Sequence, residues 1–131
     1  MATLAGRLGA LVLAMTAGAT PVPFTPLPAR EAPSLVRDWI RAHRQSPATG
    51  VVHDAAHTYL MATAGEQQSG GYALRFTEVV LAGDEIVATV VLTRPRPDAP
   101  VTMGLSYPAA SARIGRTERP VVFRTTEAPA P

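Results

Sequence analysis

Residues 70–82, GGYALRFTEVVLA, decide the fold class of this chain. Tyr72, Leu74 and Phe76 alternate with smaller or polar residues, which is the period of two that is typical of a strand with one buried face. The two preceding glycines, Gly70 and Gly71, predict a backbone turn that needs positive φ or the close approach of another segment. The stretch therefore predicts a turn followed by a strand.

A second strand follows at once. Ala82-Gly83-Asp84 predicts a hairpin turn, and residues 85–93 alternate in the same way. Because both faces of this run are apolar or β-branched, we expect a central strand. Further strands are predicted at residues 58–63, 101–107, 110–114 and 121–125. The prolines of residues 94–100 cannot donate to a ladder, which predicts a loop at a sheet edge. The sequence predicts a mainly β fold, a small antiparallel sandwich or open barrel of about five or six strands with one N-terminal helix.

The helix is predicted to begin at Ser34, whose hydroxyl can cap it, and to end at Pro47 to Gly50. Its apolar face comprises Leu35, Val36, Trp39, Ile40 and His43. We expect Trp39 to anchor the helix on a sheet rather than to bind a ligand.

Four regions are expected along the chain. Residues 1–19 resemble a signal peptide, because an apolar run from Leu8 to Met15 precedes small residues at a cleavage site; an uncleaved anchor is the alternative. Residues 20–33 are proline-rich and predict a linker, although Phe24 and Leu27 offer the alternative of a strap packed on the domain. Residues 34–125 form the β domain, and residues 126–131 are predicted to be a disordered tail. Cleavage predicts a secreted, periplasmic or cell-envelope protein with no stable membrane span.

Composition excludes several classes of function. The chain of 131 residues has room for one core, and it contains no cysteine, so it has neither disulfides nor a thiol nucleophile. Its 12 basic residues are all arginine and are scattered, against 10 acidic residues. Because binding to nucleic acid needs a concentrated basic patch, we expect no nucleic-acid partner.

His53 and His57 are four residues apart, a spacing that superficially resembles a zinc-protease motif. The acid between them is Asp54 rather than glutamate, no third ligand is evident nearby, and the segment leads into a strand, on which the two imidazoles separate. Asp84 and Glu85 fall in the predicted hairpin turn, and no serine lies in a nucleophile motif. We therefore predict no metal, no cofactor and no enzymatic activity.

Several motifs follow one another in a fixed order along the chain. They are Tyr59 to Gly65, Ser69-Gly70-Gly71-Tyr72, a hairpin, the proline-rich loop of residues 94–100, Ser106-Tyr107-Pro108 and Val121-Val122-Phe123. This ordered set resembles the C-terminal domain of the protease complex subunit PrcB family. The chain departs from the family pattern in two places: Gln68-Ser69 stand where the family has Pro-Thr, and Ala109 stands where it has an aromatic residue.

The resemblance implies an exported accessory domain that associates with a protein partner such as a protease, and it brings no catalytic residues. Candidate partner-binding residues are Gly70, Gly71, Tyr72, Tyr107 and Pro108, since a turn beside an edge strand can accept a partner strand. The alternative that the glycines only shape the turn and the tyrosines are core stays open. So does a second function, a small-ligand or cell-wall glycan-binding β module that stacks ligands on Trp39, Tyr59, Tyr72 and Tyr107. The oligomeric state is also left open.

Overall fold

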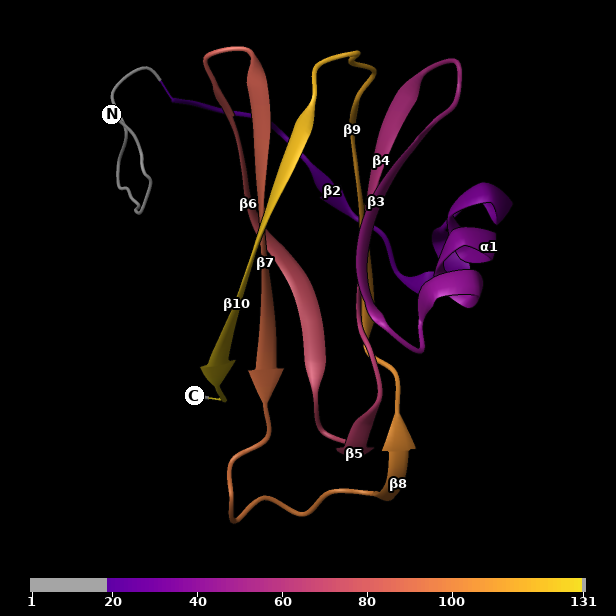
Figure 1. Cartoon of the computed structure of the whole chain (residues 1–131), viewed down its shortest axis with the longest axis vertical. Coiled ribbons are helices and arrows are strands. Elements are labelled where there is room, and N and C mark those ends of the chain that lie inside the picture. The colour runs from indigo at the N-terminus through magenta and orange to yellow at the C-terminus, as the bar shows by residue number, and fades with distance from the viewer. Residues whose placement is uncertain (1–18, 131) are drawn as a thin grey trace.

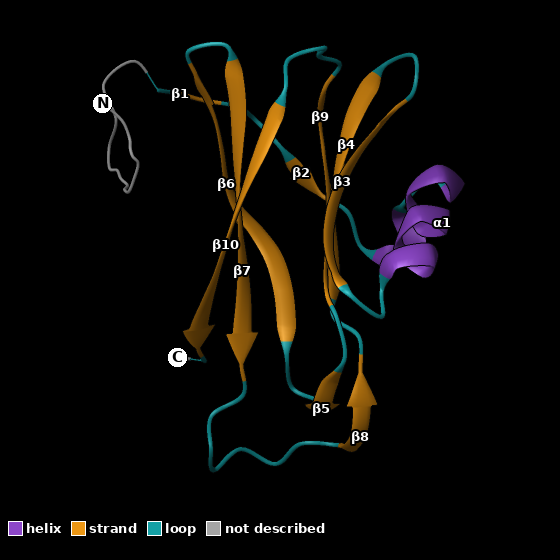
Figure 2. Cartoon of the chain, in the orientation of Figure 1, coloured by secondary structure: helices purple, strands orange, loops and turns teal. Residues whose placement is uncertain are grey.

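The computed structural model describes residues 19–130, so the predicted signal peptide lies outside the described residues except for Ala19. Two four-stranded sheets face each other, and a helix lies on the outer side of one of them (Figure 1). A two-stranded ribbon lies at one end of the two sheets (Figure 2). The predicted mainly β fold with one N-terminal helix is confirmed, in the form of a sandwich.

The first sheet has the order β1 (Thr20–Pro21), β6 (Ala73–Ala82), β7 (Glu85–Arg94), β10 (Val121–Pro129). The second sheet has the order β2 (Thr25–Pro26), β9 (Ala109–Gly115), β4 (His57–Ala64), β3 (Pro47–His53). The ribbon consists of β5 (Gln67–Ser69) and β8 (Met103–Ser106). A short 3₁₀ helix η1 (Ala29–Glu31) precedes α1 (Ser34–His43). All six predicted strands are present, and β1, β2, β3 and β5 are additional.

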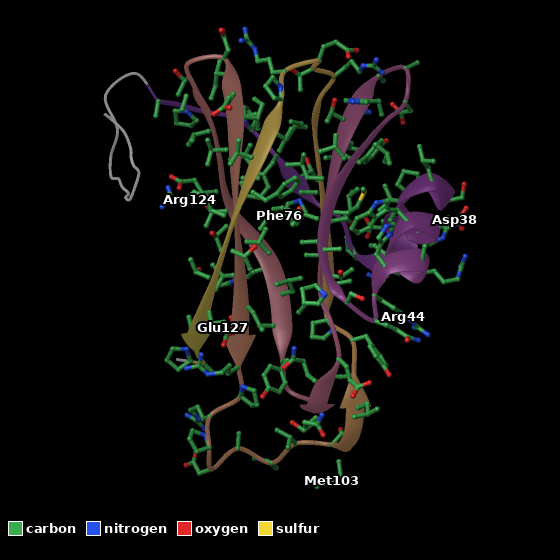
Figure 3. The ribbon with its side chains drawn as sticks, in the orientation of Figure 1. Asp38, Arg44, Phe76, Met103, Arg124 and Glu127 are labelled. Carbon is green, nitrogen blue, oxygen red and sulfur yellow. The ribbon has the colours of Figure 1, made fainter. Side chains whose placement is uncertain are left out.

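The main core fills the space between the sheets. Alternate residues of β6 and β7, such as Phe76 and Val90, meet Leu60 of β4 and Ile114 of β9. Phe76 lies between the sheets (Figure 3), with its ring centroid 6.3 Å from that of Phe123 on β10. The period of two predicted for residues 72–76 and for β7 therefore reports the inner face of the first sheet correctly, while a bulge between Phe76 and Glu78 moves the inner face of β6 to Val79 and Leu81.

The strand that is covered on both faces is β4. On one face Leu60 belongs to the main core, and on the other Tyr59 and Met61 belong to a second core beneath α1. The predicted central strand, β7, does pair with a strand on each side, β6 and β10. Its outer residues, including Val87 and Val91, are only half-buried, because no described element packs over that face.

Strand β10 corrects two predictions. It pairs with β7 in parallel, so the sheet is not wholly antiparallel. It also continues to Pro129, so the prediction of a disordered tail is wrong for residues 126–129, which pair with residues 91–94. An ion pair between Arg94 and Glu127, 3.0 Å, joins the two strands there. Such an edge strand is held mainly by backbone groups, so its side chains carry little apolar signal.

The linker predicted at residues 20–33 is also wrong, and the alternative of a strap is correct. The N–H of Val22 donates to the carbonyl of Val79, 2.8 Å, and the N–H of Leu27 to that of Ser111, 3.0 Å. Phe24 packs against the main core and Leu27 against the second core. The prolines are compatible with this pairing because edge strands leave alternate N–H positions without a partner.

Helix α1 is anchored as predicted, by Trp39. The indole lies so close to Gly50 of β3 that a Cβ at that glycine would be 2.6 Å from the ring. Val36 is fully buried beside it. Leu35, predicted on the buried face, is instead 48% exposed, so the apolar arc of the helix is narrower than expected.

The start of α1 differs in its chemistry from the prediction. Ser34 is the first helical residue but no side-chain cap is present. The carbonyl of Pro33 instead accepts the N–H groups of Val36 and Arg37, both at 3.0 Å. Pro47 to Gly50, expected to end the helix as a turn, form the first half of β3.

Candidate protein-binding site

The ribbon brings together the two halves of the predicted partner-binding site. Gly70, Gly71 and Tyr72 directly follow β5, while Tyr107 and Pro108 directly follow β8. The N–H of Gly70 donates to the carbonyl of Thr102 at 2.9 Å, and the hydroxyl of Ser106 donates to the carbonyl of Ser69 at 2.7 Å. Residues 32 and 37 positions apart in the sequence are therefore neighbours at one end of the sandwich.

The two glycines have different structural roles. Gly71 has φ of +89°, and a Cβ there would lie 2.9 Å from Val101 and 3.0 Å from Pro95. Gly70 is not in the positive-φ region, and a Cβ there would be 3.2 Å from Thr102. Glycine is thus required at position 71 both by the positive φ and by the close packing of Val101 and Pro95, and at position 70 only by the close packing of Thr102. Together they hold the proline-rich loop against the start of β6.

The two tyrosines and Pro108 also make contacts within the domain. Tyr72 is half-buried and packs against the main core. Tyr107 donates its hydroxyl to Glu66, 3.3 Å, and Arg44 lies over its ring, 5.4 Å from the centroid. The carbonyl of Pro108 accepts the N–H of Ala64 at 3.0 Å. All three residues therefore fix the ribbon onto the sandwich.

The large side chains that the ribbon exposes to solvent are not those of the predicted site residues. Met103 is 85% exposed and Leu105 is 53% exposed, and both belong to β8. Met103 lies at the end of the ribbon farthest from the main core and points away from it (Figure 3). The sequence does contain a signal, because Val101, Met103, Leu105 and Tyr107 alternate as one apolar face. That signal predicts burial, whereas the ribbon leaves the sandwich and exposes Met103 and Leu105, the two middle residues of this face, to solvent.

The turn between β3 and β4, which the paired histidines flank, lies at the end of the sandwich opposite the ribbon (Figure 1). His53 ends one strand and His57 begins the next, so no helix brings their imidazoles together. The Nδ1 atom of His53 is 2.9 Å from the hydroxyl oxygen of Thr58. Within residues 19–130 no group of three or more His, Cys, Asp or Glu side chains is placed to hold a metal ion.

Asp54 organises this turn. One carboxylate oxygen accepts the N–H groups of Ala56, 2.9 Å, and His57, 2.7 Å, while the other accepts the hydroxyl of Tyr59, 2.7 Å. The hydrogen bond from Tyr59, followed by those from the two N–H groups, lowers the pKa of Asp54. The same hydrogen bond raises the pKa of Tyr59. Arg116 donates to the carbonyl of Asp54 at 2.6 Å, which ties the turn to the segment after β9.

Replacing Tyr59 by phenylalanine is expected to lower the free energy of unfolding at pH 7, because the carboxylate of Asp54 loses the hydroxyl donor that contributes most to lowering its pKa. The folded-state pKa of Asp54 lies below its unfolded value, so its contribution to stability is present above about pH 4 and is lost as pH falls through the folded pKa. The deficit of the variant should therefore shrink as pH falls below about 4 in urea unfolding. Tyr107→Phe, whose hydroxyl bond is long and exposed, is the control and should cost little. A deficit that does not shrink as pH falls below about 4 would contradict this role for Asp54.

The four aromatic residues of the glycan-binding alternative do not form an exposed surface. Tyr59 is buried, and Trp39, Tyr72 and Tyr107 are half-buried. Stacking on a sugar ring requires an accessible aromatic face. Tyr59 is therefore not available for stacking, whereas the other three side chains keep part of their surface accessible.

No helix within the described residues is long and apolar enough to cross a membrane. Residues 58–115 match the family model described as PrcB C-terminal. Comparison with curated proteins and with solved structures gave no match. The matched segment begins in β4, ends with β9 and includes the whole ribbon. Over these residues the chain resembles the PrcB C-terminal family, as its sequence motifs predicted.

Proposed function

We propose that this chain is an exported, non-catalytic protein-binding domain that serves as an accessory subunit of an exported protease or a similar partner. The observation that carries the proposal is the exposure of Met103 and Leu105 on the ribbon, inside the segment that matches the PrcB C-terminal family. The family match supports association with a protease complex. The sequence of residues 1–19 supports export.

The ribbon is suited to protein contact for physical reasons. Large apolar side chains that are exposed together on a small element favour burial against another surface. Methionine is flexible and polarisable, so Met103 can adapt to the shape of a partner. The residues first expected to bind, Gly70, Gly71, Tyr72, Tyr107 and Pro108, hold this pair in place, so their role in the proposal is to position the contact surface.

A double variant, Met103→Ser with Leu105→Ser, tests the proposal. We expect the tagged full chain to co-purify with an exported protease from the native host at physiological salt, and the double variant to recover at least tenfold less. Burial of one such side chain contributes roughly 1.5–3 kcal/mol, and about 1.4 kcal/mol is already a factor of ten in affinity.

The matched control is Leu35→Ser, which removes an apolar side chain of similar exposure from α1, away from the ribbon. Recovery with this control should equal that of the unaltered chain. Equal recovery with the ribbon variant would remove the ribbon as the contact surface. Failure of the unaltered chain to enrich any exported protein would refute the proposed function itself.

A further inference from the structure

An open slot of about 420 Å³ lies between the two sheets, on the side where β3 and β10 are the edge strands. Its floor is made of Ala62, Ala64, Leu74, Val90 and Leu92. Its rims come from residues 47–49 of β3 and from Thr125 and Glu127 of β10. The slot is thus apolar inside and has a free sheet edge on each side, within the described part of the chain.

The backbone of β10 offers hydrogen-bonding groups along this slot. The N–H of Ile86 donates to the carbonyl of Pro120, and the N–H of Ala130 donates to that of Arg94. In a parallel ladder only every second residue of a strand bonds to a given neighbour. These two bonds show that the even-numbered residues of β10 are the ones that bond to β7. Odd-numbered residues, including Thr125 and Glu127, therefore direct their N–H and C=O groups away from β7. None of these outward groups has a backbone partner among the described residues.

Arg124 is a charged residue of β10 on the face of the first sheet that is opposite the slot. Arg124 lies between Phe123 and Thr125, and it points away from the second sheet (Figure 3). It makes no salt bridge to an acidic side chain of residues 19–130. A strand placed beside β10 would set its outward side chains next to Arg124 and its inward side chains over the slot.

We propose that this slot binds an extended segment of another protein, which adds a strand to β10. Such a segment carries small apolar side chains at alternate positions, facing the slot, and an acidic side chain between them, facing Arg124. The strand geometry satisfies the outward N–H and C=O groups of β10, which a compact small molecule would leave unpaired. The cavity volume is in the range of about 300–1,000 Å³ that ligand pockets use.

This site is separate from the ribbon. The slot shares Gln67 with β5 but neither Met103 nor Leu105. The inference therefore does not rest on the proposed function. The two can fail independently, because the ribbon is tested with serine variants at Met103 and Leu105 and the slot with a synthetic peptide.

The probe is an acetylated and amidated heptapeptide, Val-Thr-Val-Glu-Val-Thr-Val, added to the full chain labelled with ¹⁵N. We expect saturable shifts of amide signals confined to β10, β3 and the slot floor. A peptide of the same composition without alternation, Val-Val-Thr-Thr-Glu-Val-Val, is the control and should produce none. Shifts that are equal for both peptides, or that lie elsewhere, overturn the proposal.

Two variants sharpen the test. Thr125→Pro removes an outward N–H without removing a ladder bond, so it should abolish binding while Thr125→Ser retains it. Arg124→Glu should weaken binding about fivefold, and replacing the glutamate of the peptide by lysine should restore it. If Thr125→Pro proves unfolded, the pairing of Arg124→Glu with the lysine-containing peptide tests the proposal without it. An unchanged affinity in Arg124→Glu, or a concentration-dependent dimer that pairs β10 with β10 in the absence of peptide, would refute the proposal.

Discussion

Replacing Gly50 by alanine is expected to lower the free energy of unfolding by about 2 kcal/mol, the middle of the range for an overpacked site. The added Cβ would lie 2.6 Å from two ring carbons of Trp39 and 2.7 Å from its indole nitrogen. Trp39 cannot move freely, because it stacks on His43 at a centroid distance of 4.1 Å and packs with the second core. The overlap therefore has to be relieved by a shift of α1 away from β3.

Urea unfolding of four chains measures this effect: the unaltered chain, Gly50→Ala, Trp39→Ala and the double variant. If the cost arises from the contact, alanine at position 50 should cost far less once Trp39 is removed. Gly115→Ala is the matched control, since a Cβ at that strand glycine meets no atom within 4 Å and its φ is not positive. A cost of Gly50→Ala that persists in the Trp39→Ala background would show that the helix contact is not its cause.

The same glycine explains why one strand could not be predicted from the sequence. Proline and glycine shortly after a helical pattern indicate the end of the helix, so Pro47 and Gly50 are interpreted as a turn. In the structure both residues belong to β3. The reason for Gly50 lies in tertiary structure, in the indole that covers it. By contrast, the alternation in β6 and β7 is a local signal, and it located both strands and, apart from the part of β6 after its bulge, their inner face correctly.

The ends of the domain were missed for a related reason. Residues 20–33 and 126–129 have few consecutive apolar residues, yet both segments pair with strands that the sequence did reveal. Edge strands depend on backbone bonds to a preformed sheet, and composition does not record such bonds. The candidate site also has a part that could be predicted from the sequence and a part that could not. The turn at Gly70 and Gly71 was predictable from residue type, while the exposure of Met103 depends on where the ribbon lies.

Replacing Gly71 by alanine is expected to have the largest effect, about 3 kcal/mol. Positive φ contributes roughly 1–2 kcal/mol for any residue with a Cβ, and overlap with Val101 and Pro95 adds a further cost of similar size. Those two neighbours lie in the segment that joins β7 to β8, so the change also loosens the ribbon. Stability is measured by urea unfolding, and ribbon order by amide hydrogen exchange of residues 103–106.

Two other glycines separate the contributions. Gly83 has φ of +63° but a Cβ there meets no atom within 4 Å, so Gly83→Ala should cost only the conformational part, about 1 kcal/mol. At Gly70 an added Cβ would contact Thr102, but φ is not positive. Gly70→Ala should therefore lower the free energy of unfolding by less than Gly71→Ala does. Equal costs at Gly71 and Gly83 would mean that close approach contributes nothing. The larger cost at Gly71, together with faster exchange confined to the ribbon, would establish that this glycine holds Met103 and Leu105 in position through the loop that packs on it.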